Sequence, residues 1–367
     1  MTYTFTKSRC IMSKQKEKGN VADIARMVGV SPGTVSNALN NRNGVSKETK
    51  DKILAVAKEL GYTRNHLRKQ DNTIKFVQIK RHGNVVGDTY FFSEVIQGIE
   101  RKCRKNHFEL SMVNINLAET TENEVKQYFQ GETSDGIIVL ATEMWSSDQN
   151  MLKSASQPLV ILDNSFRLSD YDCVLIDNEG GVYSAIKYLV EMGHRRIGIL
   201  HSSAYINNFY IRKKAFHFAM SDFGLSVRDE DVYLLSSNIE GAYQDMLKSL
   251  ETINSLPTAL FADNDLIALG AIRALKEKGY SIPEDVSIIG FDDTPFCEMS
   301  SPTLSTVCVD KQGMGALAVK QIIGNIKRGT IKSITKTHVA TKLIIRNSVA
   351  RVEPEKPLEN LEINKYL

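Results

Sequence analysis

The stretch NVADIARMVGVSPGTVSNALN, residues 20–40, decides the fold of the amino-terminal part of this chain. It reads as two short helices joined by a tight turn. Asn20 and Ser31 carry side chains that cap the first and the second helix. Gly29 supplies a left-handed residue at the end of the first helix, and Pro32 stands at the first position of the second, where its missing N–H costs nothing. The stretch therefore predicts a compact helical hairpin.

The small and apolar residues of this hairpin have the spacing of a helix-turn-helix. Ala25, Gly29 four residues later and Val35 six beyond that allow two crossing helices to approach closely and pack. Short polar residues remain on the outer face of the second helix, where they suit base edges and phosphates in a major groove. These residues are Ser31, Gly33, Thr34, Ser36 and Asn37. The alternative is an ordinary surface hairpin, which a single match of this kind leaves open.

A third helix follows the loop after Asn40. Ser46 caps it and Gly61 marks its end. Its expected inner face consists of Ile53, Leu54, Ala57 and Leu60. The sequence thus predicts a three-helix domain, preceded by a basic arm in which Met12 is an alternative to Met1 as the start.

Residues 21–65, VADIARMVGVSPGTVSNALNNRNGVSKETKDKILAVAKELGYTRN, resemble the DNA-binding headpiece of the lactose-repressor (LacI/GalR) family of bacterial transcription regulators. The segments GVSPGTVSNALN and ELGYTRN are the most specific parts of the match. The resemblance implies a headpiece that binds a palindromic, double-stranded operator as a homodimer, followed by a core like a sugar-binding protein. The residues expected to contact DNA are Ser31, Pro32, Gly33, Thr34, Ser36, Asn37, Asn40, Lys47 and Asn65.

The linker after the headpiece departs from the family pattern. Relatives carry a proline, then a hinge helix with an alanine and a leucine that wedges into the minor groove. Here Arg64 replaces the proline, Arg68 stands at the alanine position, and Asp71 falls where the leucine is expected. The linker is also several residues shorter than the linker of these relatives. We therefore expect no standard leucine wedge at the operator centre.

Charge is distributed unevenly along the chain. Residues 1–70 contain 14 Lys and Arg against 5 Asp and Glu, whereas the rest contains 32 against 38. A basic end on an acidic body suits a protein that binds a polyanion such as DNA. The stretch 311–351, with nine Lys and Arg and no acid, is either a face near DNA or a solvated basic surface.

The composition argues against several other classes of protein. No apolar run reaches the roughly 18 residues of a membrane span, and no secretory signal is visible, so a cytoplasmic protein is expected. The five cysteines are scattered and the seven histidines form no cluster, which predicts neither disulfides nor a metal site. Gly313 begins a stretch like a dinucleotide fingerprint, but no acid follows within residues 311–351, so no cofactor is expected.

From Ile74 onward strand and helix patterns alternate, which predicts an α/β fold of parallel sheets. We expect two doubly wound lobes around a hinged cleft, the second beginning with CVLIDN at 173–178, and a helix at 314–328 that crosses back to the first. The expected domains are a basic arm (1–19), the headpiece (20–65), a short hinge (66–73), a two-lobed, periplasmic-binding-protein-like effector-binding and dimerisation core (74–350) and a tail (351–367).

Several core segments resemble family motifs at the right separations, among them TYFFSEVIQGIE, GHRRIGIL and VSIIGFDD. The effector-binding residues expected from this resemblance and from the strand ends are Phe91, Asp163, Arg212, Asn264, Phe291 and Asp292. A carboxylate and a guanidinium can hold vicinal hydroxyls, which favours a sugar. Each polar residue is alternatively a helix cap or an interlobe salt bridge. Aromatic residues expected either to stack on a ring or to lie in the core are Tyr90, Phe91, Trp145, Phe209 and Phe291.

Together these features predict a transcriptional repressor of a carbohydrate-utilisation operon, controlled by a small-molecule effector, a sugar, in the cleft. One rival is a global regulator of the same fold that answers to a phosphocarrier protein instead of a sugar. Another is an enzyme that uses the cleft, which is disfavoured because the sequence has no nucleophile elbow, P-loop, metal cluster or acid–base pair.

Overall fold

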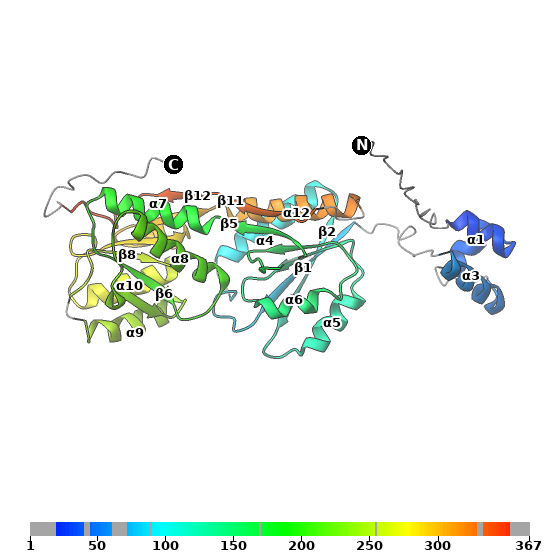
Figure 1. The fold of residues 1–367 in the computed structure, drawn as a ribbon, viewed down its shortest axis with the longest axis horizontal. Helices are drawn as coiled ribbons and strands as arrows, with labels where there is room; N and C mark the ends of the chain where they lie inside the picture. Colours follow the sequence, from blue (N-terminus) through cyan, green and yellow to red (C-terminus); the bar gives the residue numbers. More distant parts are fainter. Residues whose placement is uncertain are drawn as a thin grey trace, which may run out of the picture. The chain divides into compact units, whose positions relative to one another are not determined.

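The computed structural model describes residues 20–39, 45–60, 72–87, 90–168, 170–253, 255–328 and 333–352 (Figure 1). Contacts divide the chain into two compact units, one within the first 71 residues and the other from Asn72 onward. We refer to the described part of the first as the headpiece and of the second as the core. The predicted contacts of Asn40 and Asn65 and the departures in the linker lie outside the described residues.

The headpiece consists of α1 (Val21–Val28), α2 (Pro32–Leu39) and α3 (Lys47–Glu59). Asn20 caps α1 in a reciprocal capping box with Asp23, and Gly29 follows with a φ of +75°. The Ser31 hydroxyl accepts the backbone N–H of Thr34 at 3.1 Å, which caps α2. The predicted helix-turn-helix is therefore confirmed. Its buried centre is formed by Ile24, Ala25, Val35, Ala38, Ile53 and Ala57.

The predicted inner face of α3 is wrong at one position. Leu54 is 44% exposed, whereas Ile53 and Ala57 are buried one turn apart. Since adjacent helical residues are about 100° apart, Leu54 points away when Ile53 points inward. The predicted Leu60 packs at the margin of the centre, and Val56 packs there in place of Leu54.

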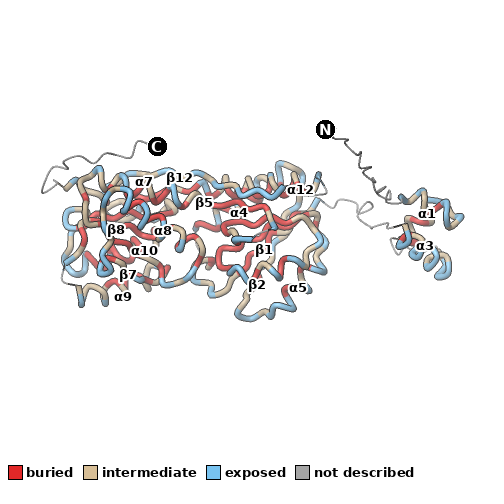
Figure 2. Tube along the Cα trace, in the orientation of Figure 1, coloured by how far each residue is buried: buried red, intermediate tan, exposed pale blue. Residues whose placement is uncertain are grey.

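Lobe 1 of the core is a six-stranded sheet in the order β11-β5-β4-β3-β1-β2, with every pair parallel. The central strands are buried along their whole length because helices cover both faces (Figure 2). The strands are β1 (Thr73–Lys80), β2 (Glu109–Asn116), β3 (Gly136–Leu140), β4 (Leu159–Leu162), β5 (Asp172–Ile176) and β11 (Lys336–Val339). The helices are α4 (Tyr90–Lys105), α5 (Glu122–Gly131), η2 (Ser146–Asp148), α6 (Gln149–Leu152) and α12 (Lys311–Arg328).

Lobe 2 repeats this arrangement in the order β12-β10-β9-β8-β6-β7. Its edge strand β12 runs antiparallel to β10, and the remaining pairs are parallel. The strands are β6 (Ile197–Ser202), β7 (Val232–Leu235), β8 (Ala259–Ala262), β9 (Ser287–Asp292), β10 (Ser305–Val309) and β12 (Thr341–Ile344). The helices are α7 (Asn178–Glu191), α8 (Asn207–Asp222), η3 (Asp229–Asp231), α9 (Ile239–Leu250), α10 (Asp265–Glu277) and α11 (Phe296–Met299).

Three segments of chain cross between the lobes: β5 to α7, β10 to α12, and β11 to β12. They lie along one side of the core, at the top of Figure 1. The predicted return of the 314–328 helix to lobe 1 is confirmed, since α12 packs on α4. The assignment of 173–178 to the second lobe is wrong: β5 pairs with β4 and β11 in lobe 1. A buried parallel strand carries no local signal of its sheet, so the pattern alone misplaced it.

Two glycines allow α4 and α12 to touch backbone to backbone. A Cβ on Gly98 would lie 2.1 Å from the carbonyl oxygen of Gln312, and one on Gly315 would lie 2.2 Å from that of Val95. Carbon and oxygen atoms that are not bonded to each other do not come this close. The pair of glycines therefore sets how closely the two helices of lobe 1 approach.

We expect Gly98→Ala to destabilise the protein, although alanine is the better helix former by about 1 kcal/mol. The added methyl group must push α12 away from α4, and overpacking of this kind costs about 1–3 kcal/mol. Thermal and urea unfolding would measure the loss. Gly131→Ala is the control, because no atom lies within 4 Å of a Cβ at Gly131. Equal stability of the two variants would contradict the close packing.

Candidate functional site

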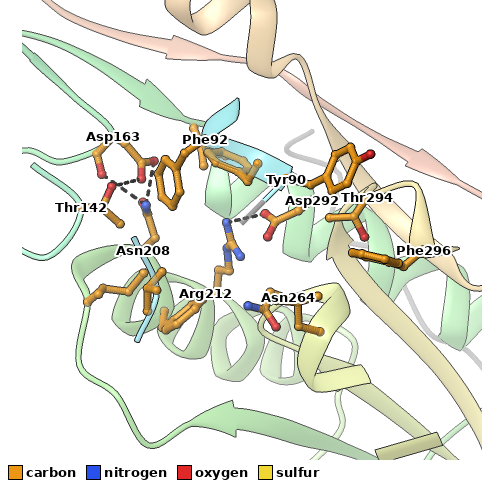
Figure 3. Close-up of a pocket in the computed structure, with 16 residues that line it drawn as sticks. Tyr90, Phe92, Thr142, Asp163, Asn208, Arg212, Asn264, Asp292, Thr294 and Phe296 are labelled. Atoms are coloured by element: carbon orange, nitrogen blue, oxygen red, sulfur yellow. Dashed lines mark hydrogen bonds and ion pairs between the residues drawn. The ribbon is translucent and has the colours of Figure 1, made fainter. Parts of the chain in front are cut away.

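A pocket lies where the carboxyl ends of the strands in the two lobes face each other (Figure 3). The space open to the centre of a water-sized sphere is about 110 Å³. One water molecule needs roughly 10–15 Å³ by this measure, so the pocket has room for a compact ligand. Aromatic rings form much of its wall, namely Tyr90, Phe91, Phe92, Phe209 and Phe296. Its polar lining consists of Thr142, Asp163, Asn208, Arg212, Asn264, Asp292 and Thr294.

Asp163 joins the two lobes across the pocket. It follows β4 of lobe 1 and is 2% exposed. Its Oδ2 accepts the hydroxyl of Thr142, also in lobe 1, at 2.6 Å. Its Oδ1 accepts the side-chain amide of Asn208, on α8 of lobe 2, at 2.9 Å. The two lobes are therefore held together in part by a buried hydrogen bond to a carboxylate.

Arg212 occupies the centre of the lobe 2 wall and is 2% exposed. Its Nε donates to Asn178 at 2.8 Å, its Nη1 donates to the carbonyl of Asp263, and its Nη2 lies 3.4 Å from Asp292. The guanidinium also stacks on Phe291, 3.6 Å from the ring centroid. Each side of the cation is thus bound by protein, which fixes its orientation toward the pocket.

Both pocket carboxylates stand on strained backbone. Asp163 has a φ of +65° and Asp292 one of +107°, a region that side-chain-bearing residues rarely adopt. Such residues cost about 1–3 kcal/mol each and tend to occur at functional sites. Lys311 holds the strained backbone at Asp292 in place, since its ammonium donates to the carbonyls of Asp292 and Asp293 at 2.6 and 3.1 Å. The surrounding structure therefore imposes the directions of these carboxylates.

The same two carboxylates bind protons more tightly than usual. Burial raises the pKa of Asp163 to about 6, although hydrogen bonds from Thr142 and Asn208 oppose the rise. Burial raises the pKa of Asp292 to about 7, with Arg212 opposing it. The pocket thus offers two acids that titrate near neutral pH, each of which can accept or donate a hydrogen bond.

Most of the predicted effector residues meet in this pocket. Its lining includes Phe91, Asp163, Arg212, Asn264 and Asp292. Asn264 is also a helix cap, because its Oδ1 accepts the backbone N–H of Ile267 at 2.9 Å and begins α10. Of the other aromatic candidates, Tyr90 and Phe209 line the pocket as well.

Phe291 and Trp145 do not line the pocket. Phe291 is fully buried beneath Arg212, so its predicted contact with an effector is corrected to support of the guanidinium. The reason is strand geometry: Phe291 precedes Asp292 on β9, and consecutive side chains point to opposite faces. Trp145 is 47% exposed and lies under the guanidinium of Arg81, 3.9 Å from the ring centroid.

Sequence reasoning missed several lining residues. Thr142 follows β3 by two positions, so the rule that ligands bind beyond the carboxyl ends of parallel strands could have found it. Asn208 gave no such signal, because it lies in the first turn of a helix whose polar and apolar residues are mixed on all sides. Phe92, Thr294 and Phe296 were missed too, since they depend on how α4 and α11 approach β9.

A second candidate surface lies on the headpiece. Val35 and Ala38 are buried, which turns the opposite side of α2 outward. Ser31, Pro32, Gly33 and Lys47 are exposed, and Thr34, Ser36 and Asn37 are partly exposed. The hydroxyl of Ser31 caps α2 and lies 2.9 Å from the hydroxyl of Thr34. The described residues among the predicted DNA contacts are therefore all at least partly exposed, on and just before α2 and at the start of α3.

Two further observations concern the described residues only. None of their helices is both long and apolar enough to cross a membrane. They also contain no group of three or more His, Cys, Asp or Glu side chains placed to hold a metal ion.

Residues 20–65 match the family model of bacterial regulatory proteins of the lacI family, and residues 186–349 match a periplasmic binding protein-like domain. The HTH-type transcriptional repressor PurR of Mannheimia succiniciproducens is 31% identical over 90% of this chain and 99% of the relative. The ribose operon repressor of Haemophilus influenzae is 32% identical over 83% of this chain and 91% of the relative. The solved complex of the transcriptional regulator CelR with cellobiose has a TM-score of 0.69 at 24% identity and covers 90% of this chain and 99% of that one.

Asp292→Asn should change how the stability of the protein depends on pH. The pKa of Asp292 is higher in the folded protein, about 7, than its usual value of 3.8. The unfolded chain therefore loses this proton first, and the contribution of Asp292 to the free energy of unfolding falls from about pH 4 to pH 7. Asparagine has no proton to lose. As the pH rises from 5 to 8, the free energy of unfolding of the variant should therefore increase by about 2–3 kcal/mol relative to that of the parent protein, at 1.36 kcal/mol per pKa unit.

Chemical unfolding at a series of pH values measures this difference. The exposed Glu284 of lobe 2 provides the control variant, Glu284→Gln, whose stability should follow that of the parent protein. Parallel pH profiles for Asp292→Asn and the parent would show that the pKa of Asp292 is not raised.

Proposed function

The chain belongs to the lacI family of bacterial regulatory proteins, and we propose that it is a homodimeric transcriptional repressor whose operator affinity is set by a small molecule bound between the core lobes. The observation that carries this proposal is the origin of the polar groups of the pocket. Thr142 and Asp163 come from lobe 1, whereas Asn208, Arg212 and Asp292 come from lobe 2. A ligand that contacts both sets favours the closed arrangement over an open one, and only such differential affinity can couple it to DNA binding.

We further propose that the effector is a sugar and that the regulated operon serves carbohydrate use. The pocket combines flat aromatic walls with paired carboxylates and a fixed guanidinium, which suits the apolar faces and the hydroxyl edges of a pyranose or furanose. Among the similar proteins, one is named a ribose operon repressor and another has been solved in complex with cellobiose. Aromatic walls also fit a planar base, so purines belong in any test.

On DNA, the proposal places α2 of each protomer in successive major grooves of a palindrome. Asn37 would read adenine, because its side-chain oxygen can accept from the N6 amino group of the base while its NH₂ group donates to N7. Lys47 would contact a phosphate and add affinity without sequence preference. Asn37 on α2 is partly exposed, and Lys47 at the start of α3 is exposed.

The effector half of the proposal is tested by thermal unfolding of the full chain with ribose, glucose, cellobiose, hypoxanthine and guanine. A ligand at a hundred times its dissociation constant should stabilise the protein by about 2.7 kcal/mol. Asp292→Asn should weaken the response at least tenfold in ligand concentration, since it removes a pocket carboxylate, while Glu284→Gln should leave it intact. No stabilisation by any sugar would contradict a sugar effector, and stabilisation by a purine alone would reassign the class.

The DNA half is tested by selecting bound sites from random duplexes and measuring affinity for the selected sequence. Asn37→Ala should cost about 1–3 kcal/mol and relax preference at one base pair of each half-site. Lys47→Ala should weaken all sequences alike and lower the salt slope by about 2 for a dimer, because each lysine releases about one counterion. Lys248→Ala on α9 of lobe 2 is the control. A selected site without two-fold symmetry would exclude the dimeric arrangement.

A further inference from the structure

The segment 81–87, which we call the β1–α4 loop, depends on one side chain for most of its backbone hydrogen bonds. Glu143, after β3, accepts five of its N–H groups. Its Oε2 takes those of Arg81, His82 and Gly83 at 2.8, 3.1 and 2.9 Å. Its Oε1 takes those of Val85 and Val86 at 3.0 and 2.9 Å.

This carboxylate has little contact with solvent, since Glu143 is 1% exposed. Burial alone would raise its pKa, but the amides of Val86, Gly83, Arg81 and Val85 lower the pKa below its usual value. Glu143 is therefore charged, and its charge is compensated by the loop that surrounds it. An irregular loop without strand partners needs such an acceptor, because unpaired buried N–H groups are costly.

The loop held in this way reaches both the pocket and the opposite lobe. Val85 lines the pocket. The carbonyl of the preceding residue, Asn84, accepts the hydroxyl of Ser237 of lobe 2 at 2.9 Å. Glu143 itself does not line the pocket, so it can act on a ligand only through the loop.

We propose that Glu143 is a positioning residue of the effector site: it holds the β1–α4 loop in the shape in which Asn84 meets Ser237 and seals the pocket. The proposal rests on the proposed function for its effect on ligand affinity, whereas the hold on the loop stands without any ligand. Glutamine has nearly the same shape but replaces one oxygen by an NH₂ group, which would face two or three N–H donors.

The first experiment follows amide hydrogen exchange in the full chain without ligand. The amides of 81–83, 85 and 86 should be protected in the parent protein although they lie outside helices and strands. Glu143→Gln should speed their exchange at least tenfold. The control is Glu132→Gln, which alters another carboxylate of lobe 1 that accepts backbone N–H groups, those of Thr133 and Ser134, away from the pocket. Unchanged protection in Glu143→Gln would overturn the proposal whether or not an effector is known.

Trp145 adds a spectroscopic signature. It is the single tryptophan of the chain, and the guanidinium stacked on it belongs to Arg81, whose own amide is bound by Glu143. Release of the loop should move its emission to longer wavelength in Glu143→Gln and leave it unchanged in Glu132→Gln. Unchanged emission in Glu143→Gln together with a shift in Glu132→Gln would contradict the role assigned to Glu143.

The second experiment is a double-mutant cycle on the affinity for whichever of ribose, glucose, cellobiose, hypoxanthine or guanine stabilises the parent protein. Glu143→Gln should weaken binding at least tenfold and Ser237→Ala several-fold. The double variant should bind no more weakly than Glu143→Gln alone, because both changes act through the same seal. Additive losses would show that Glu143 is merely structural and would overturn its positioning role.

Two outcomes need separate treatment. Should Glu143→Gln not fold, Glu143→Asp replaces it: one methylene shorter, its carboxylate cannot reach both groups of amides, and Val85 and Val86 should lose protection. Should no compound of the panel bind, the sugar or purine effector fails while the exchange experiment still decides whether Glu143 holds the loop.

Discussion

The buried guanidinium of Arg212 is the group on which the geometry of the pocket depends. A cation removed from water must be surrounded by acceptors, and Arg212 finds them on three elements: Asn178 at the start of α7, the carbonyl of Asp263 after β8, and Asp292 at the end of β9. The crossover from lobe 1 and two strands of lobe 2 are thereby held around one charge. Phe291 completes the support from below.

The arrangement around this charge gives the pocket two properties that a ligand would use. The chain turns through a left-handed conformation at Asp163 and at Asp292, so both carboxylates point into the space between the lobes. Burial also raises the pKa of each, which leaves the pair close to the balance between neutral and charged forms. A ligand that supplies hydrogen-bond donors would favour the charged forms, and its binding would then release protons.

Two devices link the pocket to the rest of lobe 1. The rings of Tyr90, Phe91 and Phe92 belong to the first turn of α4, and the close approaches of Gly98 to Gln312 and of Gly315 to Val95 join this helix to α12. The β1–α4 loop, bound by Glu143, forms the second link. Because packed elements move as units, a change in lobe closure would also move α4 and β1, and β1 begins at Thr73, next to Asn72, the first residue of the core.

Much of this could be predicted from the amino-acid sequence. The caps and the turn of the helix-turn-helix are local features, and Asn20, Gly29 and Ser31 have the roles that their chemistry indicated. Asp163, Asn264 and Asp292 could be placed at the cleft because parallel strands bring their carboxyl ends to one edge. The failures are equally specific. Leu54 was predicted to face the headpiece centre and Phe291 to face the pocket, but each points to the opposite side of its element. The strand β5 was predicted for lobe 2 and belongs to the sheet of lobe 1.

The sequence by itself determined the three-helix headpiece, the alternation of strands and helices, and the family to which the chain belongs, since these follow from capping, periodicity and motifs within a few residues of each other. Only the tertiary structure decided which side chains meet. The bond of Asn208 to Asp163 spans 45 residues, that of Arg212 to Asp292 spans 80, and that of Ser237 to Asn84 spans 153. The first and the third of these contacts depend on how the two lobes face each other, and the second depends on how α8 packs against β9 within lobe 2. No local pattern records either arrangement.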